Sequence, residues 1–141
     1  MRYKIFGKRT GLKVSKLALG TGMFGQTWGY GATPEEAKRI IEGFADAGGN
    51  FIDAADNYQH GGSETTIGDV ITANRDNFVI ASKFTRGASG NPALARLGNN
   101  RKNMVQSVEP SLKRLKTDRI DLYFAHMDDF VTPMDEIARP G

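Results

Sequence analysis

The hydrophobic positions of this chain form short extended runs that alternate with amphipathic helical stretches. The extended runs predict strands at about 17–21, 50–54, 77–83 and 119–126. In the third run, positions 78–81 are all apolar, which is typical of a strand buried on both faces. Helical spacing predicts helices within 33–50, 63–74 and 101–116, and another that opens at 132–138. This alternation predicts an α/β fold with parallel strands and right-handed crossovers.

Local signals place the ends of these helices. Thr33, Pro34 and Glu36 form a capping box with proline at the first helical position. Ser63 is the expected N-cap of the second helix. Pro110 lies inside the third helix and is expected to kink it, because proline has no N–H for the preceding turn. The apolar stripe predicted for that helix consists of Met104, Val105, Val108, Leu112 and Leu115.

The strand–helix units are preceded by an expected hairpin. In residues 1–16, extended stretches flank the glycine-containing segment GKRTG, which predicts a β-hairpin. Residues 17–141 carry four strand–helix units, compatible with an open doubly wound sheet or with a (β/α)8 TIM-type barrel. The glycines of the loop GTGMFG have the spacing of a dinucleotide fingerprint, but no helix follows the loop directly, as that fingerprint requires. We therefore expect the first four units of a (β/α)8 barrel.

Composition excludes several classes of site. The chain contains no cysteine, which rules out disulfides, thiolate metal sites and a cysteine nucleophile. The N-terminus has no apolar leader and no run is long enough to span a membrane, so we expect a cytoplasmic protein. The basic segment KRLK at 113–116 is interpreted as a solvated helix end rather than a nucleic-acid site. No metal site is expected, since His60 and His126 lie in different motifs.

Polar side chains follow three successive predicted strands. Asp53 ends the second strand, Lys83 the third and His126 the fourth, and Tyr58 lies in the loop after Asp53. Each residue alone has an ordinary structural interpretation, as a cap, a solvated lysine, a hydrogen-bonded histidine or a packed aromatic. Because neighbouring parallel strands lie about 5 Å apart, all four can meet at one end of the barrel.

These four residue types together favour proton transfer to a carbonyl oxygen. A lysine ammonium stabilises a tyrosine phenolate, which makes the hydroxyl a better proton donor. A carboxylate beside the lysine keeps it charged and in place, and a neutral histidine can orient a carbonyl group. Tyrosine then acts as a general acid. Since no side chain donates hydride, this chemistry requires a nicotinamide cofactor.

The chain resembles the aldo-keto reductase family. The similarity lies in the segments LALGTGMFG, FIDAADNYQHGGSETTIG, VIASKF and SLKRLKTDRIDLYFAHMDD, in this order. The resemblance implies a (β/α)8 barrel whose bottom is capped by the N-terminal hairpin. It also implies reduction of small aldehyde or ketone substrates, usually with NADP(H), with NAD(H) as the alternative. Gln59 departs from the family pattern, which usually has glycine at this position.

The resemblance also implies roles for individual residues. Tyr58 would be the general acid, supported by Lys83 and Asp53, and His126 would orient the substrate carbonyl. Thr21, Gly22, Met23 and Asp53 would lie near the nicotinamide and its ribose. Trp28 would line the substrate pocket together with Tyr58 and His126.

Two other hypotheses remain open at this point. The chain supplies four of eight barrel units, so it can also be a truncated, non-catalytic half-barrel. Such a half-barrel would expose two strand edges and would self-associate or pair with a complementary half. The other hypothesis is a regulatory role like that of channel-subunit relatives of this fold. None of the three hypotheses involves nucleic acid or a membrane-spanning segment.

Overall fold

The computed structural model describes residues 1–138, so the last three residues of the predicted half-barrel lie outside the described part. Two strands, β1 (Tyr3–Ile5) and β2 (Lys13–Ser15), form an antiparallel hairpin. The other four form a parallel sheet in chain order: β3 (Leu19–Gly20), β4 (Phe51–Asp53), β5 (Val79–Phe84) and β6 (Leu122–Ala125). The predicted parallel α/β fold is therefore confirmed, as one half of a barrel.

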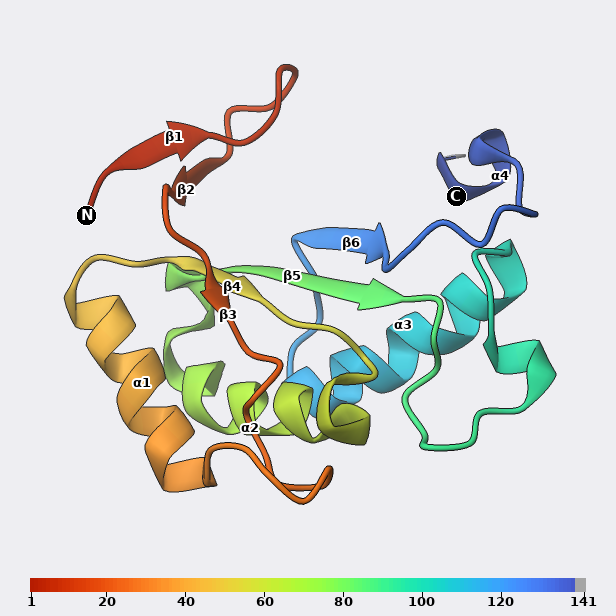
Figure 1. Ribbon diagram of the computed structural model, residues 1–141. Helices are drawn as coiled ribbons and strands as arrows, with labels where there is room; N and C mark the ends of the chain where they lie inside the picture. The colour runs from red at the N-terminus through yellow and green to blue at the C-terminus, as the bar shows by residue number, and fades with distance from the viewer. Residues whose placement is uncertain (139–141) are drawn as a thin grey trace.

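Helices cover one side of this sheet. The α-helices are α1 (Pro34–Asp46), α2 (Gly62–Ile71), α3 (Arg101–Leu115) and α4 (Met134–Ala138). Short 3₁₀ segments are η1 (Tyr58–Gly61), η2 (Thr72–Asn77) and η3 (Leu94–Arg96). In Figure 1, α1, α2 and α3 line one side of the sheet, while the β1–β2 hairpin and α4 stand on the other.

The hydrophobic core fills the layer between the sheet and these helices. Its buried members come from α1, α2, α3 and the strands: Phe24, Ala37, Ile41, Ile52, Ala54, Ile67, Ile71, Phe78, Ile80 and Leu115. The positions from Phe78 to Ala81 are all buried, as their apolar run predicted. The capping box of α1 is also confirmed, since the Thr33 hydroxyl accepts a hydrogen bond from the Glu36 N–H.

The start of α2 differs from the prediction. Gly61, not Ser63, precedes the helix, and it makes no side-chain cap. Ser63 is fully buried, and its hydroxyl donates to the carbonyl oxygen of Thr21 at 2.7 Å. Serine is a common N-cap residue, but the Ser63 hydroxyl instead joins the helix to the end of β3. The α-helix also ends early, at Ile71, and continues as the 3₁₀ segment η2.

Helix α3 buries mainly a polar face. Its buried residues are Asn103, Ser107, Ser111 and Leu115, whereas Val105 is 51% exposed. Small side chains are needed on this face because α2 approaches closely. A Cβ added at Gly68 of α2 would lie only 2.7 Å from the carbonyl carbon of Leu115. The predicted apolar stripe is covered in part: Leu115 is buried, Met104, Val108 and Leu112 are half-buried, and Val105 is exposed. Helix spacing shows which residues share a face but not how completely that face is covered.

Pro110 is accommodated within α3, which runs without interruption from Arg101 to Leu115. Proline leaves the carbonyl of Gln106 without its helical donor. The guanidinium of Arg96, in η3, donates to that carbonyl oxygen at 2.9 Å. The loop between β5 and α3 thus supplies a hydrogen-bond donor for the Gln106 carbonyl, so the helix need not kink to expose that carbonyl to another donor.

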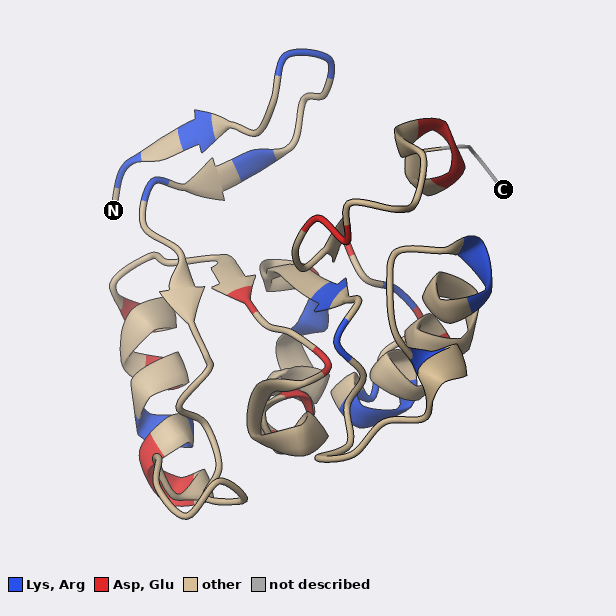
Figure 2. Ribbon diagram, turned by 45° about the vertical axis from the view of Figure 1, so that its right-hand side comes forward, with Lys and Arg blue, Asp and Glu red and all other residues tan. Residues whose placement is uncertain are grey.

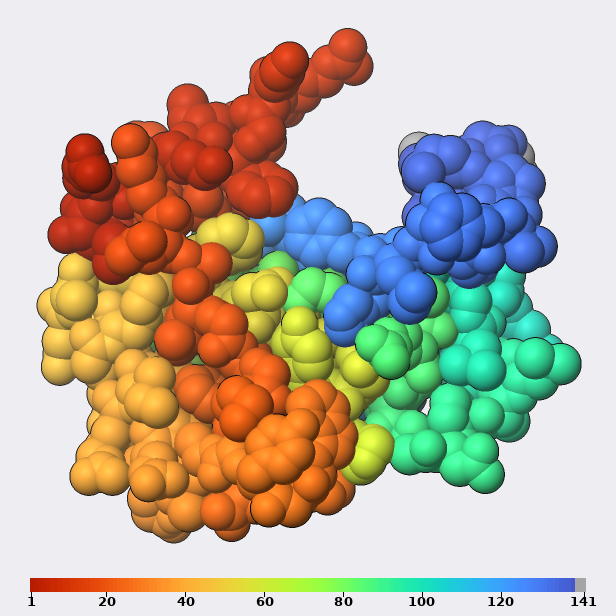
Figure 3. Space-filling view, in the orientation of Figure 1, coloured from red at the N-terminus to blue at the C-terminus, as the bar shows by residue number. Residues whose placement is uncertain are grey.

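The sheet has an open face and two edges. Within residues 1–138, β3 and β6 each pair on one side only. Figure 3 shows a hollow in the surface between the β1–β2 hairpin and the segment that ends in α4.

Figure 2 shows lysine and arginine positions spread over the hairpin, helices and loops. No helix in the described range is long and apolar enough to cross a membrane.

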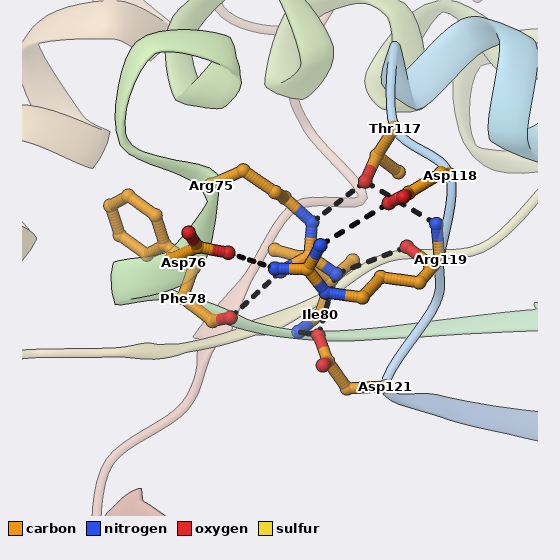
Figure 4. A network of polar contacts seen from close by, with 8 residues as sticks. All are labelled: Arg75, Asp76, Phe78, Ile80, Thr117, Asp118, Arg119 and Asp121. Atoms are coloured by element: carbon orange, nitrogen blue, oxygen red, sulfur yellow. Dashed lines mark hydrogen bonds and ion pairs between the residues drawn. The ribbon is translucent and has the colours of Figure 1, made fainter.

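A buried arginine joins two loops on the side where the strands begin (Figure 4). Arg75 of η2 is 9% exposed, and its guanidinium donates to side-chain oxygens of Thr117 and Asp121. It also donates to the carbonyl oxygens of Phe78 and Arg119. The loop before β5 is therefore tied to the loop before β6, which fixes the register between these two strands.

Candidate active site

The carboxyl ends of β4 and β5 place an aspartate and a lysine in direct contact. The Lys83 ammonium donates to the Asp53 carboxylate at 2.7 Å, and it also donates to the carbonyl oxygen of Ala54 at 2.7 Å. The lysine side chain is 15% exposed and the aspartate side chain 35%. Partial burial strengthens this ion pair relative to a surface pair. These contacts hold the lysine side chain in one position.

Tyr58 stands over this ion pair. It opens the 3₁₀ segment η1, five residues after the end of β4. The Lys83 Nζ lies 3.4 Å from the Tyr58 hydroxyl oxygen and 5.0 Å from the centre of the ring. A cation in this position stabilises negative charge on the phenolic oxygen. Lys83 thus contacts two of the other three predicted residues, Asp53 and Tyr58.

His126 completes the group from the next strand. Its ring meets the Tyr58 ring edge to face, with centroids 5.7 Å apart. Its backbone N–H donates to the Phe84 carbonyl, which continues the pairing of β5 with β6. Burial lowers the pKa of His126, and the charges of Lys83 and Arg86 lower it further, against a smaller opposing effect of Asp53. The imidazole is therefore neutral at pH 7, and its buried Nδ1 has no hydrogen-bond partner.

The residues expected near a nicotinamide lie at the ends of β3 and β4. A Cβ added at Gly22 would lie 3.9 Å from atoms of the Tyr58 ring, so glycine leaves space beside this ring. Met23, which follows Gly22, is 51% exposed. Thr21 is fully buried, and its hydroxyl donates to the carbonyl oxygen of Asp53, which ties the end of β3 to that of β4.

Trp28 lies on the loop between β3 and α1. Its ring is partly buried, and it meets the ring of His60 edge to face with centroids 6.2 Å apart. Tyr30 is 56% exposed and its ring centre also lies 6.2 Å from that of Trp28. His60 follows Tyr58 by two residues within η1, so the loop of Trp28 packs against the turn that carries Tyr58.

A second charged cluster lies behind these residues, between the sheet and helices α2 and α3. Glu64 is fully buried, and it accepts hydrogen bonds from the Arg114 Nε at 2.8 Å and from the Ser82 hydroxyl. Asp56 is 1% exposed, and its Oδ1 has no hydrogen-bond partner. Sequence reasoning missed this cluster. It also interpreted Arg114 as part of a solvated basic segment, whereas this arginine pairs with Glu64.

Asp56 gives the fold a pH dependence. Burial, and then the nearby Glu64 charge, raise the pKa of Asp56 from 3.8 to about 6, and Arg114 partly opposes the shift. The folded state therefore favours the protonated carboxyl. Its stabilising contribution is complete below about pH 4 and is lost as the pH rises through 6.

We expect Asp56→Asn to stabilise the chain at pH 8, because it removes a buried charge that lacks a partner for one oxygen. A shift of about two pKa units corresponds to at most about 3 kcal/mol in the free energy of unfolding. Urea unfolding at pH 8 and pH 4 measures this directly. The gain should disappear at pH 4. An equal gain at both pH values would show that the charge of Asp56 is not its cause.

Metal ligands do not gather anywhere in the part of the chain that the structure describes. No group of three or more His, Cys, Asp or Glu side chains there is arranged to hold a metal ion.

Comparisons with known proteins identify a matching family and similar proteins. The model of the aldo/keto reductase family matches residues 16–139. A norsolorinic acid reductase of Emericella nidulans is 38% identical over 146 residues, which cover 97% of this chain and 38% of that protein. An NADP(+) aryl-alcohol dehydrogenase of Phanerodontia chrysosporium is 36% identical over 149 residues, which cover 96% of this chain and 39% of that protein.

A solved structure from Pseudomonas aeruginosa, assigned to the aldo-keto reductases, has the same fold. It superimposes with a TM-score of 0.76 at 34% identity, covering 97% of this chain and 50% of that chain. The chain thus spans about two fifths of the length of the two fungal relatives and half of the bacterial one. The match in sequence and in fold runs over almost all of the chain, and the chain belongs to the aldo-keto reductase family.

Proposed function

We propose that this chain carries the proton-donating part of an active site that reduces an aldehyde or ketone to an alcohol. The observation that supports this most directly is the contact of Lys83 with both Asp53 and Tyr58. The Tyr58 hydroxyl donates its proton to the carbonyl oxygen as that oxygen becomes negative. The lysine ammonium then stabilises the phenolate that remains. Asp53 keeps the ammonium within reach of the phenol.

In this proposal His126 orients the substrate. Its neutral imidazole can donate a hydrogen bond to the carbonyl oxygen without competing as a cation for the Tyr58 phenolate. A bound nicotinamide cofactor would supply hydride to the carbonyl carbon, and Tyr58 would protonate the carbonyl oxygen. Gly22, Met23 and Asp53 would contact the nicotinamide and its ribose. NADP(H) is proposed over NAD(H) because the fungal relative is named for NADP(+).

The substrate class follows from the surroundings of Tyr58 and from the relatives. The ring of Trp28 packs against those of Tyr30 and of His60, which lies in the same turn as Tyr58. Aromatic side chains of this kind bind flat ligands by stacking or by edge contacts. The two fungal relatives are named for aryl alcohols and for norsolorinic acid. We therefore propose aromatic carbonyl compounds as substrates.

A half-barrel chimera tests this function. Residues 1–126 would replace the matching half of the Pseudomonas aeruginosa relative, so that the chain's own residues supply the proton donor. We expect this chimera to reduce benzaldehyde, measured by the loss of NADPH absorbance, and to lose this activity when Lys83 is changed to methionine. A chimera that folds and binds NADPH but reduces no aromatic or aliphatic aldehyde would contradict the proposal.

A further inference from the structure

Gln59 links the turn that carries Tyr58 to the aromatic loop. Its side chain is fully buried although it directly follows the candidate proton donor. Its Oε1 accepts a hydrogen bond from the backbone N–H of Trp28 at 2.9 Å. Its Nε2 donates to the carbonyl oxygen of Tyr30 at 3.1 Å. One amide thus satisfies two backbone groups on either side of Gly29, and these groups lie 29 and 31 positions away in the sequence.

The backbone at this position is arranged for that contact. Gln59 has φ 51° and ψ 34°, and His60 has φ 54° and ψ 41°, so two successive residues are left-handed. This conformation costs a residue other than glycine roughly 1–2 kcal/mol. A glutamine there is thus locally unfavourable, and the two hydrogen bonds of its amide offset this cost. The turn directs the Gln59 side chain inward, beneath the loop.

The loop is shaped to receive the amide. Gly25 and Gly31 both have positive φ, at 116° and 129°. A Cβ added at Gly25 would lie 3.2 Å from the Gln59 Cβ, and one added at Gly31 would lie 3.1 Å from its Nε2. The two glycines therefore let the backbone close around the side chain. Trp28, the only tryptophan of the chain, lies on this loop between the two glycines.

We propose that Gln59 is a positioning residue that ties the loop of Trp28 and Tyr30 to the turn that carries Tyr58, and that the aromatic surface of Trp28, Tyr30 and His60 binds planar aromatic carbonyl compounds. The second part rests on the function proposed above, whereas the first part is independent of it. A loop held in its binding conformation loses less conformational freedom when a ligand is bound, so affinity is higher. Gln59 thereby contributes to substrate preference without contacting the reacting atoms.

The first measurement uses the fluorescence of Trp28 in the 141-residue chain. Asparagine tolerates the left-handed conformation but is one methylene shorter, so Gln59→Asn cannot reach both backbone groups. We expect acrylamide to quench Trp28 about twofold more efficiently in this variant, because the loop opens more often. The matched control is Gln26→Asn in the same loop, since the exposed Gln26 amide makes only a long 3.4 Å contact to Gly31.

The outcomes of this measurement separate positioning from a general loss of structure. Circular dichroism and thermal unfolding would establish that both variants are folded. We expect increased quenching in Gln59→Asn and unchanged quenching in Gln26→Asn. Equal quenching in wild type and Gln59→Asn would overturn the proposed positioning role. This result requires neither a cofactor nor turnover, so it does not depend on the proposed enzyme activity.

The second measurement tests the ligand class with 2-naphthaldehyde as the planar probe and butanal as the aliphatic one. We expect 2-naphthaldehyde to quench Trp28 with saturation, and Gln59→Asn to weaken its binding about fivefold. Butanal should show no comparable saturation. A wild-type chain that does not distinguish the two aldehydes would overturn the aromatic preference. Inactivity of the chimera with intact naphthaldehyde binding would instead contradict the proposed reaction.

Discussion

Changing Tyr58 to phenylalanine is expected to lower carbonyl reduction by the half-barrel chimera roughly 10²–10⁴-fold, the range for loss of a positioned general acid. Phenylalanine keeps the ring that packs against His126 but has no proton to donate. Lys83 cannot replace it, because its ammonium is already directed toward Asp53 and the Ala54 carbonyl. Single-turnover rates with NADPH and benzaldehyde would measure the chemical step directly.

The fold should tolerate this change. The Tyr58 hydroxyl has one hydrogen-bond contact, with the Lys83 ammonium at 3.4 Å, which is longer than a typical hydrogen bond. NADPH binding, followed by the change in its fluorescence, should stay within about twofold of the unmodified chimera, since a hydroxyl that acts on the substrate oxygen contributes mainly to the transition state. The expected loss is therefore in the rate and not in cofactor affinity.

Tyr3→Phe provides the matched control, because it removes the same hydroxyl from a tyrosine of β1 that lies outside the candidate site. This tyrosine is 51% exposed, and its hydroxyl donates to the carbonyl oxygen of Gly48. We expect its rate to be close to that of the unmodified chimera. If Tyr58→Phe retained the rate as well, the proton donor would have to be another group. In that case the contact between Lys83 and Tyr58 would be structural.

The candidate site could be predicted because its residues follow local rules. Each of the short apolar strands β4, β5 and β6 leads to a polar residue at its carboxyl end. In a parallel sheet these ends lie side by side, so Asp53, Lys83 and His126 were expected to converge. The register of β4 with β5 pairs Asp53 with Ala81, two residues before Lys83 on the same strand, and the side chains of Asp53 and Lys83 meet in a salt bridge. Short-range patterns were therefore sufficient for this part of the molecule.

The second cluster could not be predicted because its partners are far apart in the sequence. Glu64 and Arg114 are separated by 50 positions, and only the close approach of α2 to α3 brings them together. The polar face of α3 has the same cause. Ser107 and Ser111 are buried because small residues allow this approach, whereas helix spacing alone favoured the apolar residues on the neighbouring face. Packing between helices decides such positions, and a single sequence does not show it.

The role of Gln59 was missed for a different reason. It stands where the family usually has glycine, so the sequence indicates an exception to a turn pattern and nothing more. The amide becomes informative only when the left-handed backbone directs it toward Trp28 and Tyr30. A residue that contradicts its local conformational preference is held there by tertiary contacts, which were not visible in the sequence.

The largest expected effect on stability comes from Arg75. We expect Arg75→Met to lower the free energy of unfolding by about 3–4 kcal/mol, because a buried ion pair loses one partner and leaves the other unpaired. The Asp121 carboxylate would keep only the N–H of Ile80, which donates to it at 2.8 Å. The carbonyl oxygens of Phe78 and Arg119 would lose the arginine as a donor. Urea unfolding followed by circular dichroism measures this difference.

Arg119→Met is the matched control in the same network. Arg119 pairs with Asp76 and Asp118, whose side chains are 90% and 87% exposed, and ion pairs of this kind contribute little to stability. It therefore separates loss of a buried guanidinium from loss of a surface charge next to it (Figure 4). Similar effects of the two changes would contradict the role assigned to burial.

The double variant Arg75→Met, Asp121→Asn should destabilise less than the sum of its single changes, because both break the same pair. A fully additive result would instead mean that the two loops are held by contacts that the arginine and the aspartate make separately.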